Sequence, residues 1–158
     1  MKVKLLVMDV DGTLTDGRIY IGASGELMKA FDVKDGYGIA HILPELGIIP
    51  VIITGRTSDI VAARARELGV LELHQGVGDK LACLREVAEK YGAAPAEIAY
   101  IGDDRNDTDC LDYCGIAGCP ADAAEEIKPL VTYVCRNSGG RGAVREFIDW
   151  LRENETDE

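Results

Sequence analysis

The sequence predicts an α/β fold, a doubly wound (Rossmann-like) parallel sheet. Short apolar runs rich in β-forming residues alternate along the chain with longer segments of helical pattern. Such alternation implies right-handed crossovers between parallel strands, with helices on both faces of the sheet. The length of 158 residues and the hydrophobic content of 47% suit one core. No repeat or linker interrupts the pattern, so we expect a single domain over residues 1–158.

The expected elements follow one another in the order that a doubly wound sheet requires. The strands are residues 3–8, 50–53, 98–101 and 132–134, with a further short strand in the gap between Gly55 and Lys80, and the helices cover roughly 36–47, 57–68, 79–91, 106–114 and 143–153.

One segment, residues 18–31, breaks the alternation. Two extended stretches, 18–21 and 27–31, flank a loop of four residues at 22–25, which is typical of a β-hairpin. An isolated hairpin is marginally stable in water. We therefore expect it to pack on the parent domain or on another subunit; a decorated surface loop is the alternative.

Composition excludes several classes of partner. The chain has 17 basic and 28 acidic residues and a formal charge of −11, which opposes binding to nucleic acid or to an anionic membrane. The apolar run directly before Asp9 has only four residues, 5–8, too few for a signal-peptide core, and no other run approaches membrane-spanning length. The five cysteines include no C-x-x-C pair, which favours reduced thiols and a cytoplasmic protein.

Polar residues follow the carboxyl ends of three expected strands, where open α/β sheets bind their ligands. They are residues 9–15, 54–56 and 102–107, and Lys80 stands near the start of a helix. Each piece alone is common in surface turns, but their joint occurrence at strand ends points to one site. Carboxylates gathered there would repel one another unless a cation lay among them, and oxygen ligands favour Mg²⁺.

These residues resemble the haloacid dehalogenase-like superfamily of phosphohydrolases, whose first motif, D-x-D-G-T, stands at residues 9–13. The resemblance implies that Asp9 attacks phosphorus, and that Asp11 protonates the leaving oxygen and later deprotonates the hydrolytic water. It also implies that a carboxylate oxygen of Asp9, the backbone carbonyl of Asp11 and Asp103 hold the metal.

Further residues complete this expected site. By the same resemblance, Asp104 and Asp107 orient metal-bound water. Phosphate-monoester hydrolysis is very slow without a catalyst, so the charge on the phosphoryl oxygens must be neutralised by preorganised donors. The Thr54 hydroxyl, the Gly55 amide and the Lys80 ammonium are the expected donors.

The gaps between motifs are too short for a cap domain, so we expect a capless enzyme. In detail the chain resembles the 3-deoxy-D-manno-octulosonate 8-phosphate (KDO 8-phosphate) phosphatase group. This resemblance implies a sugar-acid phosphate as substrate and a homotetramer in which the hairpins form a central barrel. The matching stretches are residues 16–20, 29–31, 35–39, 53–56, 75–76, 79–80, 100–104 and 139–146.

The choice of substrate depends on two arginines. Guanidinium groups suit carboxylates, and Arg56 and Arg64, eight residues apart, could face one opening. Related nine-carbon sugar-acid phosphatases tend to have Glu at the position of Arg56, so a nine-carbon ulosonate 9-phosphate is the alternative substrate. A non-catalytic oligomerisation or regulatory relative remains a further alternative. A phospho-accepting receiver fits poorly. Receivers have two adjacent acidic residues early in the sequence, whereas here Asp9 and Asp11 are separated by one residue and the second acidic cluster comes late.

Overall fold

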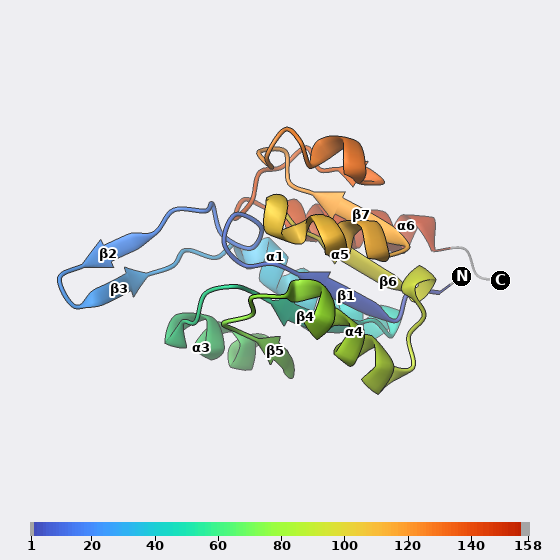
Figure 1. Cartoon of the computed structure of the whole chain (residues 1–158), viewed down its shortest axis with the longest axis horizontal. Coiled ribbons are helices and arrows are strands. Elements are labelled where there is room, and N and C mark those ends of the chain that lie inside the picture. Colours follow the sequence, from blue (N-terminus) through green and yellow to red (C-terminus); the bar gives the residue numbers. More distant parts are fainter. Residues whose placement is uncertain (1, 156–158) are drawn as a thin grey trace.

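The computed structural model describes residues 2–155 and has a parallel sheet of six strands at its centre (Figure 1). The strand order is β5-β4-β1-β6-β7-β8. The strands are β1 (Leu5–Met8), β4 (Ile49–Ile53), β5 (Glu72–His74), β6 (Ile98–Ile101), β7 (Ile116–Cys119) and β8 (Tyr133–Val134). All pairings are parallel, so the predicted doubly wound sheet is confirmed.

Helices cover both faces of the sheet. One face packs on the π-helix η1 (Gly38–Ile42), α2 (Leu43–Leu46), α3 (Asp59–Leu68) and α6 (Ala143–Asn154), and α1 (Val33–Tyr37) lies against η1 and α6. The other packs on α4 (Lys80–Tyr91) and α5 (Thr108–Tyr113). Short 3₁₀ turns lie at η2 (Pro95–Glu97), η3 (Arg105–Asp107) and η4 (Lys128–Leu130). Residues of β1 alternate between two cores, Leu5 and Val7 in one and Leu6 and Met8 in the other, as the pleat of a strand dictates.

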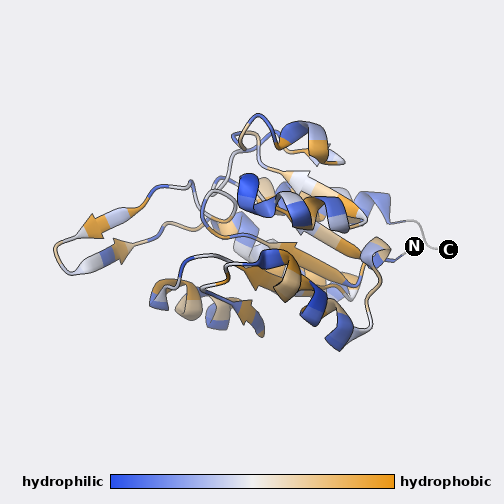
Figure 2. Cartoon of the chain, in the orientation of Figure 1, coloured by the Kyte–Doolittle hydropathy of each residue, from blue (hydrophilic) through white to orange (hydrophobic). Residues whose placement is uncertain are grey.

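The apolar residues concentrate in the central strands, and the helices are polar on their outer sides (Figure 2). Within residues 2–155, no helix combines the length and the apolar character that a membrane crossing requires. All five cysteines are free thiols.

Strand β7 was not predicted from the sequence. Three of its four residues, 117–119, are small, and Gly118 weakens the intrinsic preference for an extended strand. The strand forms because β6 and β8 pair with it on both sides. A Cβ at Gly118 would lie 2.7 Å from the Phe147 ring on α6, so the small residue lets helix and sheet approach closely. Tertiary packing here overrides local preference.

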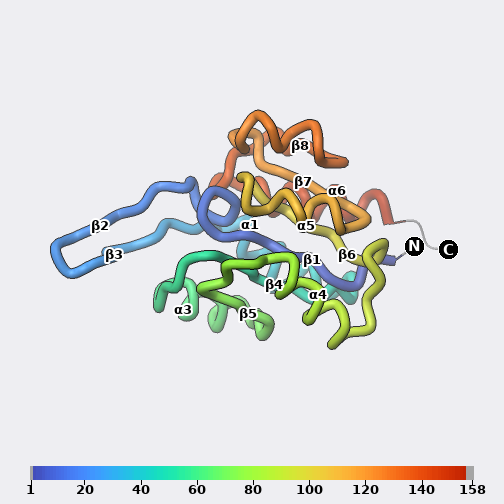
Figure 3. The backbone as a smooth tube through the Cα atoms, viewed as in Figure 1, coloured from blue at the N-terminus to red at the C-terminus, as the bar shows by residue number. Residues whose placement is uncertain are grey.

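The hairpin is present but shorter than predicted. It consists of β2 (Tyr20–Gly22) and β3 (Gly25–Met28), joined by a loop of two residues instead of four. It projects away from the sheet (Figures 1 and 3). Ile21, Leu27 and Met28 are 64%, 66% and 53% exposed, so these apolar side chains do not pack on the parent domain. Residues 29–31, expected to extend the second strand, lie beyond its end.

Candidate active site

A cavity of about 200 Å³ opens beyond the carboxyl ends of β1, β4 and β6. Its wall is formed by Asp9, Asp11, Thr54, Gly55, Arg56, Asp103, Asp104 and Asn106. Three stretches that lie far apart in sequence thus meet at the edge of the sheet where they were predicted to meet. The central strands β1, β4 and β6 are hydrogen-bonded neighbours, which brings their following loops together.

Asp9 lies at the buried end of this cavity and is held by Lys80. The Lys80 ammonium, at the first residue of α4, lies 3.0 Å from Asp9 Oδ1 and 2.9 Å from Asp107 Oδ1. All three side chains are buried. A buried ammonium shared by two carboxylates is strongly attracted to both, and burial increases that attraction. Lys80 therefore fixes the position of Asp9.

Asp107 lies behind the cavity wall and braces it. Its Oδ1 accepts hydrogen bonds from Lys80 and, at 2.6 Å, from the Tyr100 hydroxyl; its Oδ2 accepts from the backbone N–H groups of Asp103, at 3.0 Å, and Asp104, at 3.3 Å. The side chain is fully buried. These four bonds hold the turn that carries Asp103 and Asp104 to the cavity.

The acidic groups exceed the available positive charge. Oxygen atoms of Asp9, Asp103 and Asp107 all lie within 4.8 Å of one another. Burial, together with the neighbouring charge of Asp107, raises the pKa of Asp9, although Lys80 opposes the change. Burial, together with the hydrogen bond and charge of Asp9, raises the pKa of Asp103 to about 9. An oxygen-rich cluster with surplus negative charge fits a hard divalent cation such as Mg²⁺.

The loop after β1 is shaped to bring Asp103 close. Gly12 has a φ of +89°, and a Cβ at this position would lie 2.0 Å from Asp103 Oδ2. The Thr13 hydroxyl donates to Asp103 Oδ1 at 3.2 Å, and the Thr15 hydroxyl accepts from the N–H of Gly12 at 3.3 Å. Only glycine combines the left-handed backbone with the close approach. The D-x-D-G-T motif predicted this loop, but it did not predict the hydrogen bonds of Thr13 and Thr15.

The loop after β4 is anchored through its backbone. The N–H of Thr54 donates to the His74 carbonyl at 2.9 Å, and the Thr54 carbonyl accepts from Val77 N–H at 3.1 Å. Thr54 is buried at the cavity wall and Gly55 is exposed there. Two of the three expected phosphate-binding residues, Thr54 and Gly55, thus line the same cavity as Asp9, and the third, Lys80, pairs with Asp9.

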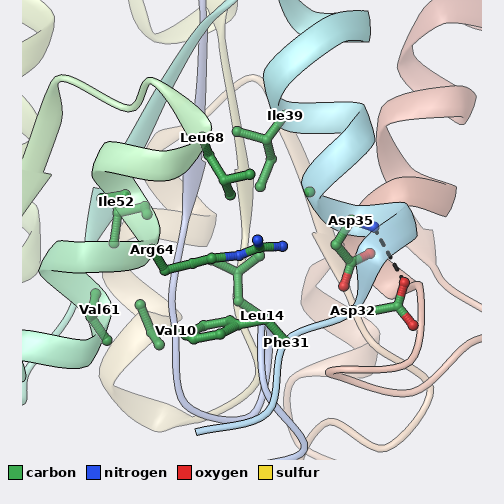
Figure 4. Close-up of a pocket in the computed structure, with 12 residues that line it drawn as sticks. Val10, Leu14, Phe31, Asp32, Asp35, Ile39, Ile52, Val61, Arg64 and Leu68 are labelled. Carbon is green, nitrogen blue, oxygen red and sulfur yellow. Dashed lines mark hydrogen bonds between the residues drawn. The ribbon is translucent and has the colours of Figure 1, made fainter.

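The two arginines lie in different places. Arg56 is half exposed and lines the cavity. Arg64 instead lines a narrow pocket between α1 and α3, where its guanidinium lies 5.5 Å from the centre of the Phe31 ring (Figure 4). It extends toward Asp35, and its Nε is buried without a hydrogen-bond partner among residues 2–155. Within one chain the two guanidinium groups do not share one opening, because Arg64 packs against the segment after the hairpin.

Sequence reasoning did not single out two residues that contact this site. Lys29, which directly follows β3, and Glu26, which lies within β3, form ion pairs that reach Asp11 and Arg56. Both come from a segment whose expected role was assembly. Lys29 lies within one of the matching stretches, which was the available signal, but its contact depends on the path of the hairpin.

Comparisons with known proteins agree with this geometry. Residues 52–148 match the haloacid dehalogenase-like hydrolase family. The chain is 45% identical over 149 residues to the 3-deoxy-D-manno-octulosonate 8-phosphate phosphatase KdsC of Escherichia coli, covering 94% of this chain and 79% of that protein.

Solved structures of similar proteins have the same fold. A 3-deoxy-D-manno-octulosonate 8-phosphate phosphatase from Moraxella catarrhalis, in complex with magnesium ion, phosphate ion and KDO, superposes with a TM-score of 0.91 at 40% identity, over 96% of this chain and 86% of that one. The cobalt-bound enzyme from Haemophilus influenzae gives a TM-score of 0.93 at 35% identity, over 96% and 88%. In fold, motif positions and sequence, the chain belongs to the haloacid dehalogenase-like hydrolase family.

Proposed function

We propose that this protein is a Mg²⁺-dependent phosphomonoesterase that hydrolyses KDO 8-phosphate to KDO and phosphate, through an aspartyl-phosphate on Asp9. The observation that carries the proposal is the burial of Asp9 beside Lys80 at the end of the cavity. The similar proteins support the substrate, because they are named for this reaction and one was solved with magnesium, phosphate and KDO.

The first step transfers the phosphoryl group to the enzyme. The Asp9 carboxylate forms a bond to phosphorus while the bond from phosphorus to the sugar oxygen breaks, and Asp11 gives its proton to that oxygen. In the second step Asp11 takes a proton from a water molecule, whose oxygen bonds to phosphorus and releases Asp9. Mg²⁺, held by Asp9, Asp103 and the carbonyl of Asp11, would supply positive charge that neutralises the phosphoryl oxygens.

The remaining residues of the cavity bind and orient. We propose that three groups donate hydrogen bonds to the phosphoryl oxygens and stabilise their negative charge: the Thr54 hydroxyl, the Gly55 amide and the Lys80 ammonium. Asp104 lines the cavity, which suits the orientation of metal-bound water. The bonds made by Asp107 suit a brace for that turn more than direct contact with water.

Recognition of the substrate carboxylate is better supported for Arg56 than for Arg64. Arg56 lines the cavity and its side chain is half exposed, so its guanidinium group is available to bind a ligand. Arg64 is partly covered by its neighbours in the other pocket. A nine-carbon sugar acid carries the same carboxylate and remains the second substrate to test.

We also propose a cytoplasmic homotetramer assembled through the hairpin. The exposed apolar side chains of Ile21, Leu27 and Met28 support contact with other copies of the chain. Light scattering of the purified protein should give the mass of four chains; the mass of a single chain would contradict the proposal.

The decisive experiment compares wild type with Asp9→Asn. Phosphate release is measured from KDO 8-phosphate, nine-carbon ulosonate 9-phosphates and hexose phosphates, each with and without Mg²⁺. Wild type should prefer KDO 8-phosphate and require the metal, and Asp9→Asn should lose at least about 10⁴-fold in kcat with an unchanged circular dichroism spectrum. Preference for a nine-carbon substrate would change the substrate assignment. Absence of phosphate release from every substrate would favour a non-catalytic relative.

A further inference from the structure

Lys29 has an unexpected environment for a residue of a protruding hairpin. It directly follows β3, yet its side chain is only 2% exposed. Its ammonium lies 2.6 Å from Asp11 Oδ1 and 3.2 Å from Glu26 Oε2. Lysine is seldom buried unless its charge is paired. This contact joins the residue that follows β3 to the residue proposed as the proton donor: Oδ1 of Asp11 accepts from Lys29, and in the acid form the proton to be donated would be carried by Oδ2.

Glu26 holds Lys29 from the other side. Its Oε1 accepts a hydrogen bond of 2.5 Å from the Ser58 hydroxyl, and Arg56 lies 4.0 Å from its Oε2. The Ser58 bond, followed by the pairing with Lys29, lowers the pKa of Glu26 against the opposing effect of burial. Ser58 also caps the N-terminus of α3 and donates its N–H to Gln75. Glu26 is therefore tied to the rigid part of the domain.

The contact leaves one oxygen of Asp11 available. The Lys29 ammonium donates a hydrogen bond to Oδ1, whereas no hydrogen bond joins Oδ2 to another group within residues 2–155. Asp11 lines the cavity. A proton donor must point at the leaving oxygen, and a displacement of about 1 Å can cost on the order of 100-fold in rate. A free aspartate has several rotamers, so fixing one oxygen limits where the other can point.

We propose that Lys29 is a positioning residue for Asp11, and that Glu26, anchored on Ser58, holds Lys29 in place. The base of the hairpin is then part of the catalytic apparatus of its own chain, in addition to any role in assembly. This inference rests on the proposed phosphatase activity.

The test replaces Lys29 with methionine, which keeps the length of the side chain and removes its charge. We compare kcat/KM for KDO 8-phosphate and for p-nitrophenyl phosphate in saturating Mg²⁺. Departure of the sugar alkoxide needs a proton, whereas p-nitrophenolate leaves without one. General acid catalysis contributes about 10²–10⁴-fold, so we expect a loss of about 30- to 100-fold with the sugar phosphate and less than about threefold with the aryl phosphate.

A purely structural role of Lys29 predicts a different pattern. Damage to the site as a whole would lower kcat/KM for both substrates by the same factor, and that result, or wild-type values for both, would overturn the inference. The matched control is Lys34→Met, an exposed lysine of α1, which should stay within about twofold of wild type on both substrates.

A second variant covers the case in which Lys29→Met does not fold. Glu26→Gln keeps the size and an acceptor for Ser58 but loses the charge that holds Lys29. It should show the same selective loss, smaller in size because its effect is indirect; equal losses on both substrates would again overturn the inference. Failure of wild type to release phosphate from either substrate would instead refute the proposed function, and this inference with it.

Discussion

Replacement of Asp35 by asparagine should change how the stability of the protein depends on pH. Asp35 is a buried residue of α1, and its Oδ1 accepts a hydrogen bond of 2.8 Å from the N–H of Arg145 in the first turn of α6. Its Oδ2 is buried without a partner among the described residues. Burial raises the pKa of Asp35 from 3.8 to about 6, although the hydrogen bond from Arg145 opposes the change.

The direction and the size of this pH dependence follow from the difference between the pKa of Asp35 in the folded and unfolded states. The folded state keeps the proton on Asp35 to a higher pH than the unfolded state does, so wild type loses stability as pH rises from about 3.8 to about 6. A shift of about two pKa units corresponds to about 3 kcal/mol, of which about 2.5 kcal/mol falls between pH 4 and pH 8. An asparagine side chain does not ionise, so the Asp35→Asn variant should gain about 2.5 kcal/mol relative to wild type over that interval.

The assay is urea unfolding of both proteins at several values from pH 4 to pH 8 in EDTA. The fluorescence of Trp150, the single tryptophan, reports on α6 itself. Other carboxyl groups titrate in both proteins and cancel in the difference. Asp112→Asn, on the exposed side of α5, serves as the control and should follow wild type. This pH dependence would be refuted if the free energies of unfolding of Asp35→Asn and wild type differed by an amount that stays constant within about 0.5 kcal/mol from pH 4 to pH 8.

Two further substitutions test the geometry of the cavity. Gly12→Ala places a methyl group within 2.0 Å of Asp103 Oδ2 on a backbone of φ +89°; we expect kcat to fall at least about 100-fold and the Mg²⁺ concentration for half-maximal activity to rise, and activity within about threefold of wild type would contradict this. Tyr100→Phe removes the buried 2.6 Å hydrogen bond to Asp107; unfolding in urea should show a loss of about 1–3 kcal/mol, and a loss below about 0.5 kcal/mol would contradict the bracing role.

Much of the fold and of the cavity could be predicted from the sequence because the signals were local. Strand β1 is an apolar run followed at once by Asp9, and the strands at 49–53 and 98–101 end in the same way before Thr54 and Asp103. Parallel strands in one sheet present their carboxyl ends at one edge, so the residues after them must meet there. The start of the helix at Lys80 agrees with the cap that the Asp79 side chain provides.

The tertiary structure alone decided the features that depend on long-range packing. Strand β7 exists because two neighbours pair with it, which its small residues did not indicate. The spacing of Arg64 from Arg56 allowed both to face one opening, yet Arg64 packs on Phe31 in another pocket. Lys29 meets Asp11 because the chain returns from the hairpin beside the first motif. Sequence periodicity reports which face of an element is buried, whereas the path of a connecting segment determines which distant side chain lies against it.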